Sequence, residues 1–389
     1  MRFAEYTDEW HKFALSDFVT RITRKNKNNE SSLPLTISAQ YGLVDQITFF
    51  NKTVASVDLS GYYLLYNGDF AYNKSYSNDY AWGAVKRLDK YEKGCLSSLY
   101  FVFRPKDSVD SDYLTHYFET KKWHKGISDI AGEGARNHGL LNMAVDDYFA
   151  TKHFLPAIDE QKKIAAFLNK IEKRIDIQNK IISKYESLIK GLIDHLLVTN
   201  DDKLYSFKDL YEKAGEGGTP ATDKKDFYKN GDIPFIKIDD LLQKYIVENS
   251  DFITSLGLVK SSAWLVPANS VIFSNGATIG RISINTYPIA TKQGVLGIVP
   301  SRLILTEYLY YYMKSAYFRK QVRRITVKGT MDCAYLKDLN TIACYIPEKA
   351  IQEKRLNLLS ALDEKISSEK EYLKKLKEQK KYLLSKMFI

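Results

Sequence analysis

The chain contains 389 residues, 44% of them hydrophobic and 27% charged, a balance typical of globular proteins with two or three domains. The net charge of +10 favours an anionic partner, either nucleic acid or a membrane surface. The N-terminal segment lacks an apolar core, and no apolar run approaches the roughly 18 residues of a membrane helix, which excludes a signal peptide and a bilayer span.

The N-terminal part of the chain, residues 1–155, predicts a mixed α/β domain with short strands. Residues 62–66 and 99–103 are rich in aromatic and branched side chains and predict strands, whereas residues 112–125 predict a helix. Turns that contain Asn-Gly or proline separate these segments. We expect this first domain to end at residue 155.

Residues 156–197 predict one long helix. Apolar side chains recur there at alternating intervals of four and three residues, which is the heptad spacing of a helix that packs along another helix. At 1.5 Å per residue, residues 159–197 would span about 58 Å. The predicted seam contains Leu168, Ile171, Ile175, Ile182 and Leu192.

Residues 198–347 predict a second mixed α/β domain, with strands at 270–273 and 295–299 and a helix at 303–328. Residues 348–389 then repeat the long helix. An offset of 191 residues aligns Pro156 with Pro347 and Gln161 with Gln352, and it continues through both helices without a gap. One apolar stripe alone is typical of a helix packed on its own domain, but two matching stripes favour a helix pair. The second seam contains Leu359, Leu362, Ile366, Leu373 and Leu383.

The linker between the first helix and the second domain is short and polar, so the second domain must begin at the far end of the first helix. A second helix that packs along the first must then run back, which makes the pair antiparallel. We therefore expect an α+β protein with two mixed α/β domains, separated by two long antiparallel coiled-coil helices, and with a pseudo-two-fold internal repeat.

No catalytic or metal-binding constellation is visible in the sequence. The glycine-rich residues 214–220 lack the Gly-Lys-Ser/Thr ending of a phosphate-binding loop and follow residues 207–213, which predict a short helix rather than a buried strand. A simple turn and a backbone that approaches a phosphate are alternative interpretations of this stretch. The six histidines and three cysteines show no metal-ligand spacing, and so few cysteines indicate a reducing cytoplasm. We therefore expect no catalytic residue, no metal and no cofactor bound by this chain.

Basic residues gather shortly before each proline that precedes a long helix. In the second domain they would form one basic edge of a helix, and in the first domain Lys125 and the two lysines named below occupy the comparable helix. A solvated surface is one interpretation, but the recurrence in both domains favours contact with phosphates. The two clusters are Arg319, Lys320, Arg323 and Arg324, and Lys121 and Lys122.

This duplicated organisation resembles the DNA-specificity subunits of type I restriction–modification systems. The resemblance covers essentially the whole chain. It rests on the Pro-x4-Gln segments at 156–161 and 347–352, on Gly217-Gly218-Thr219-Pro220 with Gly231-Asp232-Ile233-Pro234-Phe235, and on the stretch from Phe318 to Pro347. Two features depart from the pattern: the first domain has no Gly-Gly-Thr-Pro, and Ile351 stands where Glu160 precedes the first glutamine.

The resemblance implies a subunit that is not an enzyme by itself and that recognises a bipartite double-stranded DNA target. Residues 1–155 and 198–347 would be target-recognition domains, one for each half-site. Residues 156–197 and 348–389 would be spacer helices that dock two methyltransferase subunits and the restriction (motor-nuclease) subunits. S-adenosylmethionine, ATP and Mg²⁺ would be bound by those partners, and no membrane would be involved.

Residue type and loop position nominate the side chains that would contact base edges or phosphates of DNA. A non-catalytic coiled-coil scaffold with two protein- or glycan-binding modules is the alternative function, whereas a free-standing nuclease or methyltransferase lacks its motifs. The candidate DNA-binding residues are Lys121, Lys122, Arg136, Asn137, Thr219, Lys224, Lys225, Asn275, Arg281, Arg319, Lys320, Arg323 and Arg324.

The excess positive charge is unevenly distributed along the chain. Residues 1–155 contain 19 basic and 19 acidic residues, so the first domain is neutral, whereas residues 198–347 and 348–389 each carry a net charge of +4. Local clusters and partner subunits would then have to supply the positive field over the first half-site.

Overall fold

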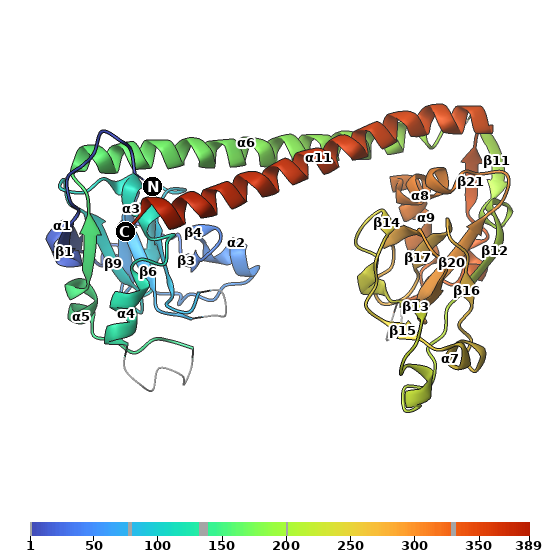
Figure 1. The fold of residues 1–389 in the computed structure, drawn as a ribbon, viewed down its shortest axis with the longest axis horizontal. Helices are drawn as coiled ribbons and strands as arrows, with labels where there is room; N and C mark the ends of the chain where they lie inside the picture. The colour runs from blue at the N-terminus through green and yellow to red at the C-terminus, as the bar shows by residue number, and fades with distance from the viewer. Residues whose placement is uncertain (1, 77–79, 132–138, 200, 328–331) are drawn as a thin grey trace. The chain divides into compact units, whose positions relative to one another are not determined.

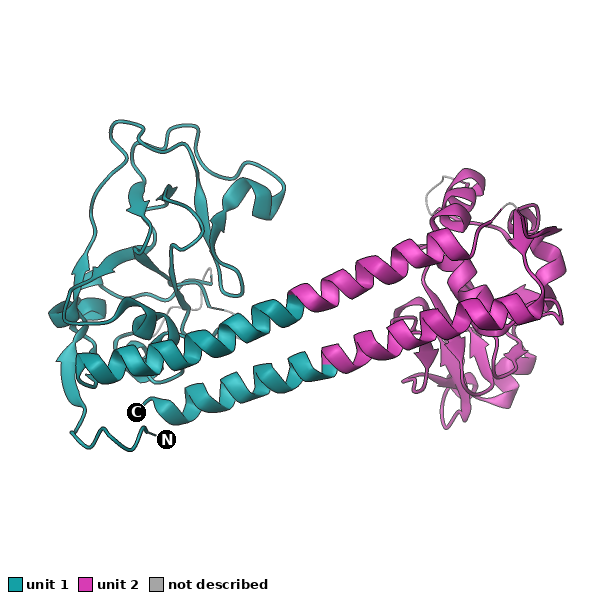
Figure 2. Ribbon diagram, turned by 90° about the horizontal axis from the view of Figure 1, so that it is seen from above, with its two compact units in different colours: residues 1–179, 371–389 teal, residues 180–370 magenta. Residues whose placement is uncertain are grey.

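The computed structural model describes residues 2–76, 80–131, 139–199, 201–327 and 332–389 (Figure 1). The chain folds into two compact units, unit 1 with residues 1–179 and 371–389, and unit 2 with residues 180–370 (Figure 2). Each unit combines one α/β domain with a part of each long helix, α6 (Ile158–Leu196) and α11 (Lys349–Met387). The boundaries of the two units therefore fall within the long helices and differ from those of the four predicted segments, because the ends of the helices pack on the α/β domains.

Unit 1 is built around an antiparallel sheet with the strand order β2-β9-β6-β7, beside the strand pairs β1-β10, β3-β4 and β5-β8. Its strands are β1 (His11–Ala14), β2 (Val19–Arg21), β3 (Leu35–Ser38), β4 (Gly42–Asp45), β5 (Tyr63–Tyr66), β6 (Phe70–Asn73), β7 (Ala84–Arg87), β8 (Lys93–Leu96), β9 (Phe101–Pro105) and β10 (Lys152–Leu155). Its shorter helices are α1 (Leu15–Phe18), α2 (Gln46–Phe50), α3 (Ser111–Tyr117), α4 (His124–Ile130) and α5 (Val145–Ala150).

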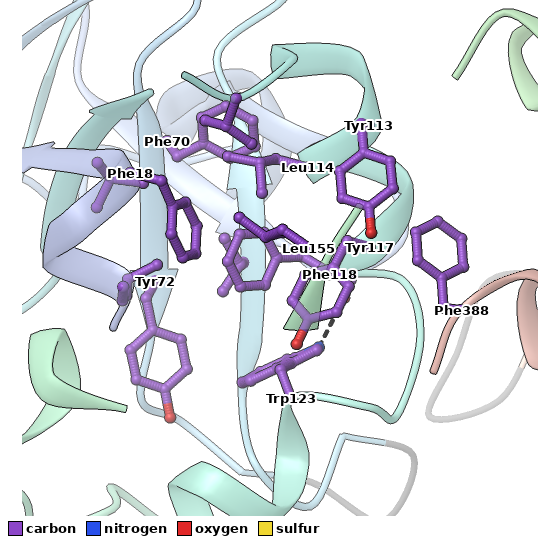
Figure 3. Close-up of a cluster of buried hydrophobic side chains, with 14 of the residues drawn as sticks. Phe18, Phe70, Tyr72, Tyr113, Leu114, Tyr117, Phe118, Trp123, Leu155 and Phe388 are labelled. Atoms are coloured by element: carbon purple, nitrogen blue, oxygen red, sulfur yellow. Dashed lines mark hydrogen bonds between the residues drawn. The ribbon is translucent and has the colours of Figure 1, made fainter. Parts of the chain in front are cut away.

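An aromatic core joins the sheet of unit 1 to its helices (Figure 3). Phe70 stacks on Phe103 with ring centroids 5.5 Å apart, and Tyr72 stacks on Tyr148 at 4.7 Å. Phe388, next to the last residue of the chain, packs against Tyr113 with ring centroids 5.2 Å apart. Because buried aromatic rings contribute much of the apolar area of a core, the end of α11 is an integral part of unit 1.

Unit 2 has a five-stranded sheet of order β12-β20-β17-β18-β14, a second sheet of order β15-β13-β19-β16, and the pair β11-β21. The strands are β11 (Lys203–Ser206), β12 (Tyr211–Glu216), β13 (Ile233–Ile236), β14 (Tyr245–Ile246), β15 (Phe252–Ile253), β16 (Leu265–Val266), β17 (Val271–Ser274), β18 (Ile282–Asn285), β19 (Ile289–Thr291), β20 (Val295–Pro300) and β21 (Ala343–Ile346). The helices are α7 (Ser255–Val259), α8 (Thr306–Lys314), α9 (Ala316–Ile325), α10 (Leu336–Leu339) and the 3-10 turns η1 (Phe207–Leu210), η2 (Lys225–Phe227) and η3 (Ile238–Asp240).

The two units repeat one order of elements. The strand pair β11-β21 of unit 2 corresponds to β1-β10 of unit 1, and the sheet core β12-β20-β17-β18 corresponds to β2-β9-β6-β7. The offset of 191 residues that aligns the two sequences carries β10 onto β21 and α6 onto α11 without a change of boundary. The predicted α+β class and the internal repeat are therefore confirmed at the level of individual elements.

The predicted strands are all present, as β5, β9, β17 and β20. The predicted single helix at 112–125 is wrong, because Thr120 Oγ1 donates to the Tyr117 carbonyl at 2.7 Å and turns the chain between α3 and α4. The predicted helix at 303–328 is divided at Ser315, whose hydroxyl accepts a hydrogen bond from Phe318 N at 3.1 Å and caps α9. Residues 207–213 form a 3-10 turn and the start of β12 rather than one helix.

Each unit contains an antiparallel segment of the helix pair. In unit 1, Leu168 and Ile171 of α6 lie in the same core as Leu383 of α11, and Glu172 pairs with Lys380 while Arg174 bonds Tyr372. The core of unit 2 contains Leu359, Ile366 and, partly buried, Leu192 and Leu362. Ile175 and Leu373 are partly buried and Ile182 is buried. No helix among the described residues is long and apolar enough to cross a membrane.

Candidate nucleic-acid interface

The basic edge predicted in the second domain lies on α9. Phe318 and Val322 bury one face of this helix in the core of unit 2, which leaves the opposite face to solvent. All four cations of that face are exposed, and within the described part of the chain no carboxylate lies within 4.0 Å of them. These residues are Arg319, Lys320, Arg323 and Arg324. They form an uncompensated basic surface, and their contact with phosphate stays a prediction.

The two lysines predicted in the first domain, Lys121 and Lys122, lie in the turn between α3 and α4 rather than on a helix. Both are exposed, and both line a hollow of about 1000 Å³ on unit 1. Lys377 and Lys381 of α11 line the same hollow. Arg136 and Asn137, which were predicted to contact bases, lie outside the described residues.

The glycine-rich stretch of the second domain is explained by close packing. A Cβ atom on Gly217 would lie 1.8 Å from the Thr291 carbonyl oxygen, and one on Gly218 would lie 2.1 Å from Ser262 Oγ. Only glycine fits such approaches, so the two glycines need no phosphate to account for them. Thr219 follows them and is half-buried, while Lys224 and Lys225 stand exposed at the start of η2.

Of two further candidates of the second domain, one is buried and the other forms hydrogen bonds within the protein. Asn275 is 0% exposed, its backbone N–H donates to the Gly294 carbonyl at 3.0 Å, and its carbonyl accepts from Ala334 N at 2.8 Å. A wholly buried side chain cannot reach a base edge, so the structure does not support Asn275 as a base-reading residue. Arg281 donates to the Ile238 carbonyl and to Asp239 Oδ1, both at 3.0 Å, and remains one-third exposed.

The glutamine of each Pro-x4-Gln segment anchors a long helix to its domain. Gln161 accepts a hydrogen bond from Asp110 N at 2.9 Å and donates to the Pro156 carbonyl at 2.9 Å. Gln352 accepts from Leu305 N at 2.9 Å and donates to the carbonyls of Pro347 and Leu303 at 2.9 Å. The accepted bonds come from the N-cap residues of α3 and α8, so the same anchor joins helix and domain in both units.

Cations replace apolar seam residues at two positions of α11, and both form ion pairs with carboxylates of their own unit. Arg355 stands where α6 has Ile164, and its Nη1 lies 2.6 Å from Asp202 Oδ2 in unit 2. Lys380 stands where α6 has Ile189, and its Nζ lies 2.7 Å from Glu119 Oε2 and 2.5 Å from Glu172 Oε1 in unit 1. The broken seam pattern was the available sequence signal for these sites, but it does not name the partners.

Lys380 also lies beside a cluster of side chains in unit 1 that could ligate a metal ion. His116, Glu119 and Glu172 are the one group of possible metal ligands found among the described residues, with ligand atoms within 4.8 Å of one another. The ammonium group of Lys380 lies between the two carboxylates and supplies the positive charge that a cation would bring. Burial alone would lower the pKa of Lys380, but Glu119 and Glu172 outweigh it and raise that pKa above its ordinary value.

Comparisons with known proteins converge on one family. Residues 201–378 match the family model of the type I restriction modification DNA specificity domain. The MjaIX specificity subunit of Methanocaldococcus jannaschii is 27% identical over 305 residues, which cover 73% of this chain and 69% of that protein. The EcoR124I/EcoR124II specificity subunit of Escherichia coli is 26% identical over 190 residues, covering 44% of this chain and 45% of that protein.

Solved structures show the same fold. A chain from a structure on complex assembly and conformational transition of the type I R-M system superposes with a TM-score of 0.63 at 14% identity, over 98% of both chains. The type I restriction–modification S subunit from M. genitalium superposes with a TM-score of 0.53 at 15% identity, over 100% of this chain and 99% of that one.

Proposed function

We propose that the chain is a specificity subunit of a type I restriction–modification system and that it reads a two-part DNA target with one α/β domain per half-site. The observation that carries this proposal is the duplication of elements between the two units, since two equivalent domains suit two half-sites. The exposed basic edge of α9 supports DNA as the ligand, because phosphate contacts supply most of the affinity of DNA-binding proteins.

The long helices complete this proposed function. Gln161 and Gln352 tie each domain to the start of its own helix, so helix length would fix the spacing at which the half-sites are read. The exposed faces of α6 and α11 would dock two methyltransferase subunits, and the restriction subunits would join that complex. Those partners would bind S-adenosylmethionine, ATP and Mg²⁺ and flip the target base, while this chain supplies recognition without catalysis of its own. The three cysteines are free thiols, which supports a location in the reducing cytoplasm.

The deciding experiment is a methylation assay with the chain and the methyltransferase that co-purifies with it. We expect methyl groups on adenines within one two-part motif, and only when this chain is present. Methylation without the chain, or at an uninterrupted motif, would contradict the proposal. Specific capture of a glycan or protein ligand, with no DNA binding, would instead support the scaffold alternative.

The basic edge of α9 has its own test. Replacement of Arg323 and Arg324 by alanine is expected to weaken binding to every DNA sequence, because phosphate contacts carry no sequence information. The slope of log affinity against log salt should fall by about 2, close to one per lost contact. The matched control replaces Lys208 and Arg302, exposed cations of unit 2 outside α9, and should leave the slope unchanged. An unchanged slope in the Arg323/Arg324 variant would remove these residues from the interface.

A further inference from the structure

The hollow on unit 1 is lined by lysines from two distant parts of the sequence. Lys86, Lys121 and Lys122 come from the first domain, and Lys377 and Lys381 come from the last turns of α11. The hollow measures about 1000 Å³, and Glu119 is its acidic lining residue. Lys380 of α11 also lines the hollow. Four of these six lysines, all except Lys86 and Lys380, have no carboxylate within 4.0 Å among the described residues. The lining therefore carries an uncompensated positive charge.

The end of α11 is held firmly against the first domain. The ammonium group of Lys380 contacts Glu119, which follows α3, and Glu172 of α6, and its side chain is only 18% exposed. Phe388 inserts its ring beside Tyr113 and Tyr117, with centroids 5.2 and 5.9 Å away (Figure 3). Lys377 and Lys381 lie within one turn of Lys380, so the anchor fixes them at the hollow while leaving both exposed.

This arrangement places positive charge beside the first domain, which has no net charge of its own. Residues 1–155 have no net charge, but residues 371–389, which belong to the same unit, contain six lysines and two glutamates. The positive field over the first domain thus comes from the opposite end of the chain. The repeat does not supply it to unit 2 in the same way, because Glu186 and Ile189 of α6 occupy the positions of Lys377 and Lys380.

We propose that this hollow, formed jointly by the first domain and the end of α11, holds backbone phosphates of DNA at the first half-site. The inference rests on the proposed function. Lysine presents a hydrated point charge on a flexible stem, which suits phosphate contact without base readout. Several exposed lysines from two segments match a row of phosphates better than one small anion. Lys377 and Lys381 are then DNA-contacting residues, and Lys380 is a positioning residue.

The test replaces Lys377 and Lys381 by alanine in the complex with the methyltransferase and measures affinity for target and non-target duplexes across salt concentrations. The salt slope is expected to fall by about 1.8, which is roughly 60-fold weaker binding at 0.1 M salt if affinities are equal at 1 M. Both duplexes should lose the same factor. The control replaces Lys374 and Lys375, exposed residues of the same helix that do not line the hollow, and should keep the wild-type slope.

The outcomes separate this inference from the proposed function. If the wild-type complex does not discriminate target from non-target DNA, the proposed function fails. If it discriminates and the Lys377/Lys381 variant keeps its salt slope, the inference is overturned while the function stands. Loss of the methyltransferase from the purified variant, with normal DNA binding by what remains, would also overturn it and assign the lysines to that protein partner.

Discussion

Insertion of one heptad into each long helix, after Gln178 and after Glu369, is expected to shift the preferred target to a spacer about three base pairs longer. These two positions are equivalent in the repeat, and seven residues preserve the seam register. Seven residues add about 10 Å to a helix, and one base pair of DNA occupies about 3.4 Å. Each domain is anchored to the start of its own helix. Lengthening the helices should therefore increase the distance between the two α/β domains without changing the structure of either domain.

The measurement is methylation of a set of duplexes that share both half-sites and differ only in spacer length. The original spacer should lose at least about tenfold in affinity, because only one half-site can then be engaged and each mismatched base pair typically costs 1–3 kcal/mol. An insertion in one helix alone is the control, and it should reduce stability because the facing seams no longer match in length. A variant with both insertions that still prefers the original spacer would refute the role of the helices in spacing.

The periodic parts of this fold were predictable from the sequence. A heptad pattern of this length favours one long helix, and the predicted helix 156–197 differs from α6 by two residues at its start and one at its end. The internal repeat could be recognised in the sequence because the two Pro-x4-Gln segments keep the same spacing. The hydrogen bonds in the structure explain why this spacing is kept. Gln161 and Gln352 make equivalent hydrogen bonds, so proline, glutamine and the helix start must keep their separation.

Some errors of prediction have local causes, and other features were missed because they depend on residues distant in sequence. The Thr120 side chain bonds the last residue of α3, and the Ser315 side chain caps the start of α9. Such single side-chain hydrogen bonds leave no trace in the spacing of apolar residues. Asn275 has a residue type suited to base recognition, but its depth depends on the sheets of unit 2 and on strand partners distant in sequence. Lys380 disturbs the heptad pattern, and its partners Glu119 and Glu172 lie more than 200 residues earlier. Pairing over such distances depends on the tertiary fold.

Loss of the glutamine anchor should destabilise each unit, and unit 2 the more strongly. Gln352→Ala removes one accepted and two donated hydrogen bonds at a side chain that is fully buried, and it leaves Leu305 N without its partner. Gln161→Ala removes one accepted and one donated bond. An unpaired buried polar group costs about 1–3 kcal/mol, so we expect losses of about 3 kcal/mol for Gln352→Ala and about 2 kcal/mol for Gln161→Ala in the free energy of unfolding.

Hydrogen exchange resolved by residue can measure each loss in its own unit, with Gln379→Ala as the control at an exposed position of α11. A Gln352→Ala loss no greater than that of the control would show that the anchor is dispensable. Because the two anchors lie in different compact units and share no partner, the double variant should lose the sum of the single losses. Its discrimination between spacer lengths should fall as well, since a domain released from its helix can no longer be held at a defined distance along it.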